Sequence, residues 1–278
     1  MTESEINALV SLLEDTDEEV SYLVEKQIRH LGDEAIPFLE DHWERHSLNP
    51  SLQKRLEDLI HELQYDNFSE GLVDWKRNRQ DDLLEGVWLV AKYQYPDLEF
   101  DSLKMEVNQI YFDAWLKLRD EIHPKDAVNV LNNLFFEKYK FSANTKNFHS
   151  PANSLINQVI ETKRGNPISL CVIYLLVAQR LGLPIFGVNL PSLFILTYKS
   201  PQIQFYINVF NKGLVFERKD IDSYLKQMKM DEQEMFYQPC SNLEIIRRSL
   251  LNLMVSFKKN SETEKVKEIK YIYDKMML

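Results

Sequence analysis

A run of fourteen residues, apolar on nearly every side, constrains the fold of this chain more than any other feature. It reads ISLCVIYLLVAQRL over residues 168–181. Asn166 can cap a helix that starts there, and Pro167 suits the first turn, where no intrahelical N–H bond is needed. Gly182 ends the helix, and Pro184 prevents its continuation. Because a helix without a polar face must be buried, the sequence predicts a central helix that packs against other elements on all sides.

The periodicity of the sequence changes after this helix. Short runs of β-branched and aromatic residues are separated by turn residues, which is typical of strands. The runs cover 185–190, 193–198, 204–210 and 214–216. Asn211-Lys212-Gly213 suits a tight turn between the last two runs. We expect an antiparallel sheet packed on the buried helix, in an α+β fold that is otherwise mostly helical.

Acidic residues are concentrated in the first third of the chain. Residues 1–85 carry a net charge of −14, whereas residues 86–278 carry +4. This step predicts a separate acidic unit, which we place at residues 1–70. Apolar residues recur there at helical spacing in four segments, the last from Pro50 to Leu63. The stretch VSLLEDTDEEVSYLVEKQIRHLGDEAIPFL resembles a HEAT repeat, and an ordinary helical bundle is the alternative.

The remainder of the chain is predicted to hold a core and a terminal hairpin. The core covers residues 71–240. Its first part, 71–150, is helical and ends in a polar loop over 141–153, and its second part, 151–240, contains the buried helix and the sheet. Helical spacing of apolar residues then returns in two segments, which we expect to form a hairpin of helices over 241–278.

Composition disfavours several classes of function. The net charge is −10 and the pI is near 5.2, so the surface repels nucleic acid and anionic lipid. The first residues do not have the pattern of a signal peptide, and no apolar run is long enough to cross a membrane. Cys171 and Cys240 are too few for a disulfide framework and suit a reducing compartment. We therefore expect a cytoplasmic protein that binds neither nucleic acid nor membranes.

Several stretches between Gly86 and Phe216 resemble the SirB-type branch of the transglutaminase-like superfamily. They occur in the order found in that family and read LVAKYQYPDLEF, LNNLFFEKYKFSAN, NSLINQVIETKRGNPISL, YLLVAQRLGLPIFGVNLP and YINVFNKG. The resemblance implies a transglutaminase-like core, which is a cysteine-protease-like arrangement of a buried helix on a small sheet. Members often carry tetratricopeptide-like helices after the core, and the segment 241–278 looks like a shortened version.

Active members of this superfamily have a cysteine at the start of the buried helix, a histidine on a following strand and an aspartate or asparagine on the next. The helix N-terminus lowers the pKa of the thiol, and the imidazole takes its proton. These three positions fall on Pro167, Leu193 and Asn208, of which only Asn208 could orient an imidazole. A small shift of register would not restore the set, because no histidine lies between residues 150 and 278. The resemblance therefore implies a vestigial, non-catalytic site.

A substitute nucleophile is available in principle. Cys171 lies one helical turn after Pro167 and on the same face of the helix. Its neighbours Leu170, Val172 and Ile173 are apolar, so we interpret Cys171 as an inert thiol of the core.

One pair of histidines has a spacing that can bind zinc. His42 and His46 are four residues apart on a predicted helix, and a third ligand such as His61 or Glu57 would have to come from another helix. The zincin pattern is absent, so we interpret the pair as a solvated polar face and predict no metal site. A basic strip near the C-terminal end consists of Arg247, Arg248, Lys258 and Lys259. It could contact the acidic unit of the same or another chain, or a phosphate, and we interpret it as solvated surface.

These observations predict a non-catalytic transglutaminase-like protein, without a cofactor, that recognises a protein partner or acts as a regulatory module. Helical-repeat surfaces suit such binding. Two alternatives stay open. One is a cysteine-dependent peptidase or amidohydrolase that uses Cys171 or residues supplied by a partner. The other is a structural subunit of a homo-oligomer, in which the acidic part of one copy attracts the basic part of another.

Overall fold

A computed structural model of the chain describes residues 1–15, 17–46, 48–118 and 122–277, apart from the side chain of Glu18. The chain forms two compact units, Met1–Gly71 and Leu72–Leu278. The sequence-based division into three parts, with a separate hairpin at 241–278, stays a prediction.

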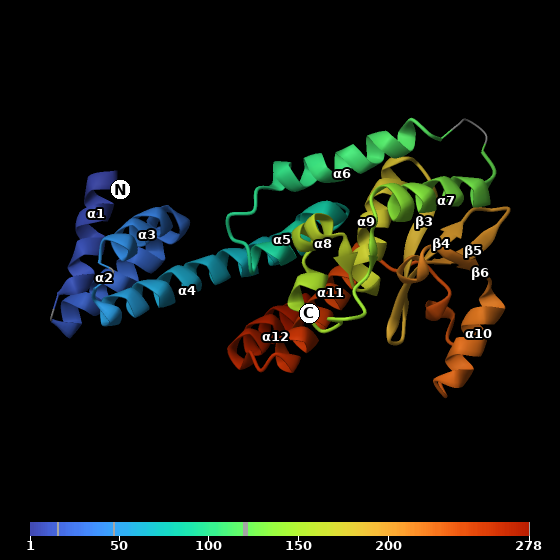
Figure 1. Ribbon diagram of the computed structural model, residues 1–278. Helices are drawn as coiled ribbons and strands as arrows, with labels where there is room; N and C mark the ends of the chain where they lie inside the picture. Colours follow the sequence, from blue (N-terminus) through green and yellow to red (C-terminus); the bar gives the residue numbers. More distant parts are fainter. Residues whose placement is uncertain (16, 47, 119–121, 278) are drawn as a thin grey trace. The chain divides into compact units, whose positions relative to one another are not determined.

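The first unit is built from helices and lies at the blue end of the colour scale (Figure 1). Its elements are α1 (Glu3–Ser11), η1 (Leu12–Glu14), α2 (Glu18–Leu31), η2 (Gly32–Ala35), α3 (Ile36–Arg45) and the greater part of α4 (Pro50–Asp74). Thr2 and Glu5 form a capping box at the start of α1, and the side chain of Asp17 caps α2. The apolar faces of these helices share one core, which includes Val10, Ile28, Leu39, Leu56 and Leu63.

Helix α4 is longer than predicted. The sequence indicated a helix from Pro50 to Leu63, but α4 continues to Asp74. The reason is that its apolar side resumes beyond a polar stretch, where Phe68 and Leu72 are both buried. The predicted boundary of the acidic unit therefore falls inside a helix and not in a loop.

The second unit is centred on α9 (Pro167–Arg180), as the sequence predicted. Asn166 caps this helix through a capping box, in which its side chain accepts a hydrogen bond from the backbone N–H of Ser169 at 3.0 Å. Every residue from Ile168 to Leu175 is buried. The prediction of a helix enclosed on all sides is confirmed.

An antiparallel sheet in the order β3-β4-β5-β6 packs on α9. Its strands are β3 (Ile185–Leu190), β4 (Leu193–Lys199), β5 (Gln204–Asn208) and β6 (Leu214–Phe216). Val188 lies opposite Ile195, and Ile207 lies between Leu196 and Val215. β5 is shorter than predicted because the side chain of Asn208 accepts a hydrogen bond from the backbone N–H of Asn211 and so starts a 3-10 turn, η6 (Val209–Asn211).

The remaining helices surround this centre (Figure 1). They are α5 (Leu83–Lys92), α6 (Phe100–Trp115), α7 (Pro124–Asn132), α8 (Ile156–Thr162), α10 (Arg218–Gln227), α11 (Asn242–Lys259) and α12 (Thr263–Met277). Helix α10 was not predicted; it covers the sheet face that carries Val188, Ile195 and Tyr206. The predicted loop over 141–153 contains a two-residue strand, β1 (Ser142–Ala143), which pairs in parallel with β2 (Arg164–Gly165), and it leads into the 3-10 turn η5 (Pro151–Ser154).

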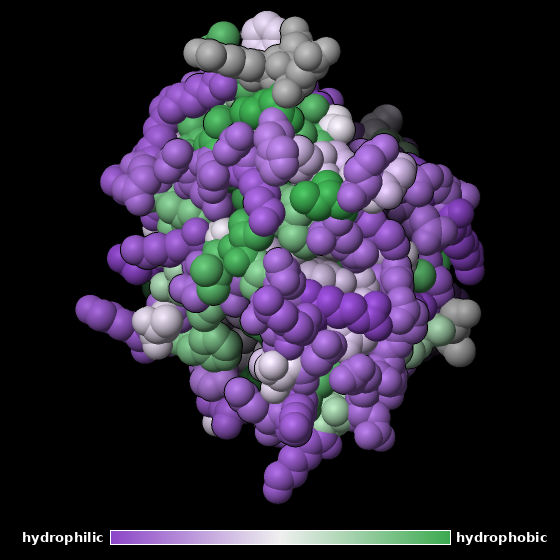
Figure 2. Space-filling view, turned by 90° about the vertical axis from the view of Figure 1, so that its right-hand side faces the viewer, coloured by the Kyte–Doolittle hydropathy of each residue, from purple (hydrophilic) through white to green (hydrophobic). Residues whose placement is uncertain are grey.

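The surface seen in Figure 2 is largely hydrophilic, with hydrophobic residues gathered near its top, the level at which α6 ends in Figure 1. The end of α6 and the residue that follows it expose Phe112, Trp115 and Leu116, each by more than half of its surface. Exposed groups of large apolar side chains mark sites of interaction more often than scattered ones do.

The turn before β6 gives a first test of the fold. Gly213 has φ +70°, and a Cβ atom there would collide with the side chain of Asn132, which donates a hydrogen bond to the Gly213 carbonyl oxygen. Gly182 has φ +73° but open space around the same position. We expect Gly213→Ala to lower the free energy of unfolding by roughly 2–4 kcal/mol and Gly182→Ala by about 1 kcal/mol. Urea denaturation of the two variants measures the difference, and equal losses would contradict the predicted collision.

Candidate functional site

A small pocket opens at the N-terminal end of α9, where an active relative would have its nucleophile. Its volume is about 190 Å³. The first turn of α9 forms one wall, the turn between β3 and β4 forms another, and α11 closes the third side. The lining residues are Phe148, His149, Asn166, Pro167, Ile168, Ser192, Phe194, Arg248, Asn252, Val255 and Ser256.

Arg248 on α11 is the charged group of this pocket. Its side chain is half-buried, and one terminal nitrogen, Nη1, lies 3.4 Å from the side-chain oxygen of Asn189. The Nε atom is buried without a hydrogen-bond partner, and no carboxylate among the described residues forms an ion pair with the guanidinium. Burial lowers the pKa of Arg248 from its usual value. A guanidinium with unused donors in a partly desolvated place is a strong binding group for a carboxylate or a phosphate.

The end of α9 adds to this positive character. A helix N-terminus carries a partial positive charge, and Pro167 leaves no N–H at the first helical position. Asn166 is held in place on both sides, because its side-chain amide also donates to the Ser154 hydroxyl at 2.9 Å. Two hydrogen bonds therefore fix the Asn166 side chain in the wall of the pocket, and the partial positive charge of the helix end adds to that of Arg248.

The three positions carried over from the superfamily lie in different surroundings. Pro167 lines the pocket. Leu193 is the first residue of β4, and its side chain packs on the cluster that faces α10. Because successive side chains of a strand point to opposite faces, it is Phe194 that lies in the pocket beside Pro167. Asn208 is engaged in capping η6. The assignment of these three residues to the family's catalytic roles stays a prediction.

Cys171 lies inside the core. Its side chain has no exposed surface, and its Sγ is 3.6 Å from the carbonyl oxygen of Phe194, to which the thiol can donate. Burial raises the pKa of the Cys171 thiol far above that of a free cysteine, so the thiolate is strongly disfavoured. Burial also raises the pKa of the other thiol, Cys240, to about 12.

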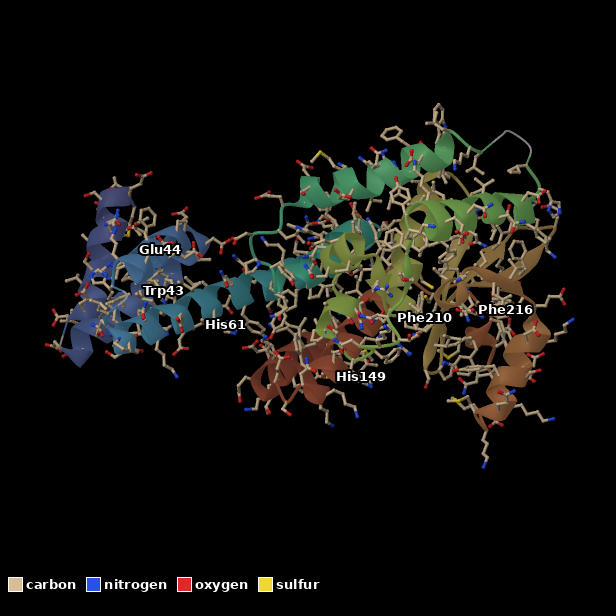
Figure 3. All side chains as sticks on the ribbon, in the orientation of Figure 1. Trp43, Glu44, His61, His149, Phe210 and Phe216 are labelled. Carbon is tan, nitrogen blue, oxygen red and sulfur yellow. The ribbon has the colours of Figure 1, made fainter. Side chains whose placement is uncertain are left out.

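One residue of the pocket, His149, was not predicted from the sequence. His149 lies in the connection between β1 and η5, next to α11 in Figure 3, and its ring meets the edge of the Phe148 ring with centroids 5.3 Å apart. Phe148 in turn lies edge-on to Phe210 at 6.3 Å. The sequence placed His149 inside a polar loop over 141–153 and assigned it no role. No feature of the residues around His149 indicated that this loop folds back over α9.

The basic strip is only partly solvated. Lys258 and Lys259 are exposed, as predicted. Arg247 donates to the backbone oxygen of Met276 at 2.8 Å, and Arg248 points into the pocket. The interpretation as solvated surface is therefore wrong for the two arginines, because α11 is buried along the side from which they extend.

The histidine pair lies in the first unit. His42 is buried, so its interpretation as part of a solvated face is wrong, whereas His46 is partly exposed. The residue that joins them is Glu14 from η1, whose Oε1 is 3.0 Å from the Nε2 atom of each histidine. The predicted third ligands have other surroundings: Glu57 accepts a hydrogen bond from the indole of Trp43, and His61 lines a separate hollow with Trp43 (Figure 3).

Comparison with known proteins decides the family. Residues 101–251, which include α9, the sheet and most of the residues that line the pocket, match the model of the transglutaminase-like superfamily. The chain belongs to this superfamily. It is similar to a UPF0162 protein of Xylella fastidiosa, with 32% identity over 143 residues that make up 50% of each chain. It is also similar to the UPF0162 protein YchA of Escherichia coli, with 26% identity over 69% of this chain and 72% of the relative.

A third relative comes from an animal. F-box only protein 21 of Mus musculus is 25% identical over 52% of this chain and 28% of its own length. The chain spans about half the length of the first curated relatives it matches. No solved structure matches it. Among the described residues, no helix is both long enough and apolar enough to cross a bilayer.

Proposed function

We propose that this protein is a non-catalytic member of the transglutaminase-like superfamily that binds a protein partner. In this proposal the pocket at the start of α9 receives a carboxylate side chain of that partner. The half-buried guanidinium of Arg248, which forms no ion pair among the described residues, is the observation that carries the proposal. An aspartate or glutamate would supply the missing acceptors.

The size of the pocket favours a side chain over a free metabolite. Sites for small molecules usually have volumes of about 300–1,000 Å³, whereas this pocket has about 190 Å³. A single side chain fits that space while the rest of a peptide lies outside. Phe148 and Val255 give the pocket an apolar side that can pack on the methylene groups of an aspartate or glutamate.

The absence of catalysis is inferred from the groups at the same place. Proline stands at the start of α9, and the thiol of Cys171 is enclosed one turn further along the helix. Neither can attack an amide in the folded protein, because a nucleophile must be both accessible and activated by a base. The exposed end of α6 with Phe112 and Trp115 supports a role in association.

Binding of carboxylates is tested with labelled peptides. A library of short fluorescent peptides with a central aspartate or glutamate is compared with the same peptides carrying asparagine or glutamine. We expect the acidic peptides to bind more tightly than the amide peptides. Arg248→Leu should lower the affinity for the acidic peptides by about tenfold or more, since a hydrogen bond to a charged group contributes about 1.5–3 kcal/mol. Arg248→Lys should retain part of the affinity, because lysine keeps the charge but not the planar fork of donors.

The matched control is Lys259→Leu, which removes a cation from the exposed end of the same helix. It should leave peptide affinity unchanged within about twofold, because surface charges contribute little. Equal affinity for acidic and amide peptides would exclude the carboxylate site. Turnover of a fluorescent amide or amine substrate by the purified protein, lost in Cys171→Ala or His149→Ala, would exclude a non-catalytic role.

The homo-oligomer stays a prediction with a simple test. If the net charges of −14 and +4 on the two parts of the sequence drive association, the molar mass measured by light scattering should fall as salt is raised, because screening weakens contacts between surface charges. A mass that is the same at low and high salt contradicts an electrostatic assembly.

A further inference from the structure

Three side chains of the first unit direct metal-binding atoms at one another. His42 lies in α3 and His46 directly follows it, so the two rings extend from the same side of the helix with centroids 4.1 Å apart. Glu14 ends η1. One ring nitrogen of His42, one of His46 and a carboxylate oxygen of Glu14 all lie within 4.8 Å of one another.

The separations are close to those that zinc requires. Zinc binds nitrogen and carboxylate oxygen at about 2.0–2.2 Å, so the ligand atoms of a tetrahedral site are roughly 3.3 Å apart. Glu14 Oε1 is 3.0 Å from each histidine nitrogen. Small rotations of the Glu14 side chain, which is 42% exposed, would therefore bring its oxygen to the required distance from the two histidine nitrogens.

The second nitrogen of His46 orients the ring. Its Nδ1 lies 2.9 Å from the backbone carbonyl oxygen of His42. A carbonyl oxygen can only accept, so Nδ1 donates to it, and Nε2 is the nitrogen that faces Glu14 and is free to bind a metal ion. Metal-binding histidines are typically held by this kind of bond from the second nitrogen.

The Nε2 atom of His42 lies in a buried place. Among the described residues it makes an ion-pair contact with Glu14 Oε1 at 3.0 Å, but this contact does not have the geometry of a hydrogen bond. A buried polar atom needs a well-placed partner, and a cation between Nε2 and the Glu14 carboxylate would supply one.

We propose that Glu14, His42 and His46 bind a zinc ion. Two imidazoles and a carboxylate are a donor set suited to Zn²⁺, whereas Ca²⁺ and Mg²⁺ prefer oxygen alone. The fourth position would be taken by water. His42 also lines a surface hollow with Asn7, Ser11 and Asp41, which gives an ion a way in. The bound ion would join η1 to the end of α3 and so hold together two segments of the first unit.

Direct titration tests the site. The chain is freed of metal with a chelator, and Zn²⁺ is titrated in competition with a coloured zinc indicator. Co²⁺ serves as a spectroscopic substitute. We expect one Zn²⁺ per chain and a Co²⁺ absorption typical of tetrahedral nitrogen and oxygen ligands. Glu14→Gln and His46→Gln should each weaken Zn²⁺ binding at least about tenfold and remove the Co²⁺ band.

Both variants change partly exposed side chains, so circular dichroism spectra like those of the unchanged protein are expected. His30→Gln, which replaces an exposed histidine of α2, is the matched control and should bind Zn²⁺ normally. No stoichiometric Zn²⁺ binding, or binding that is the same in Glu14→Gln and His46→Gln, would overturn the proposal. The peptide-binding proposal does not depend on this result, because it concerns Arg248 in the other unit.

Discussion

Iodoacetamide should label Cys171 at least about a thousandfold more slowly in the native protein than in guanidinium chloride at the same pH. Its side chain has no exposed surface, and burial raises the pKa of the thiol. Reaction therefore requires an opening of the core, and openings that expose core residues cost several kcal/mol. Mass spectrometry of labelled peptides over time measures the two rates.

The labelling experiment needs a control for the second cysteine. Cys240 is only partly enclosed, so the measurement is best made in Cys240→Ser, where Cys171 is the remaining thiol. Rapid labelling of Cys171 in the folded Cys240→Ser protein would contradict its burial and would support the alternative of a cysteine-dependent enzyme. Slow labelling of Cys171 would agree with an inert thiol in the core. The catalytic assay with Cys171→Ala would then test independently whether this thiol takes part in any reaction.

The arrangement of α9 and the sheet could be predicted because local and global signals agree. Asn166, Pro167 and Gly182 mark the ends of the helix, and alternating β-branched residues mark the strands. The end of β5 could not be predicted, because Asn208 stops the strand through its side chain, a local hydrogen bond that residue type alone does not reveal. Helix α10 was missed since its sequence, RKDIDSYLKQ, has only two buried residues.

The candidate sites were harder to predict than the fold. Arg248 looked like one of four basic surface residues, and its enclosure depends on how α11 packs against the turn between β3 and β4. His149 comes from a stretch with no periodic pattern. The histidine pair was visible in the sequence, but its partner Glu14 lies 28 residues before His42, in a 3-10 turn. Contacts between residues distant in sequence decide each of these sites, and spacing rules address only neighbours along one element.

Trp75→Ala should lower the free energy of unfolding by about 3–5 kcal/mol, the usual cost of truncating a fully buried tryptophan. Trp75 has no exposed surface, and its indole N–H donates to the carbonyl oxygen of Asp82 at 2.7 Å. The ring also lies so close to Gly86 of α5 that a Cβ atom there would be only 2.8 Å from it. Removing the ring leaves both a cavity and an unsatisfied carbonyl group.

Urea denaturation followed by circular dichroism measures this loss, with Trp115→Ala as the matched control. Trp115 is 59% exposed on α6, so its removal should change stability by no more than about 0.5 kcal/mol. Equal effects of the two substitutions would contradict the packing around Trp75. The loss should also reach the pocket, because Gly86, which touches the Trp75 ring, lies against Ile246 of α11, two residues before Arg248. We therefore expect Trp75→Ala to weaken the binding of acidic peptides even under conditions in which the protein stays folded. If Arg248 acted from a surface helix that is independent of the core, the same substitution would leave peptide binding unchanged.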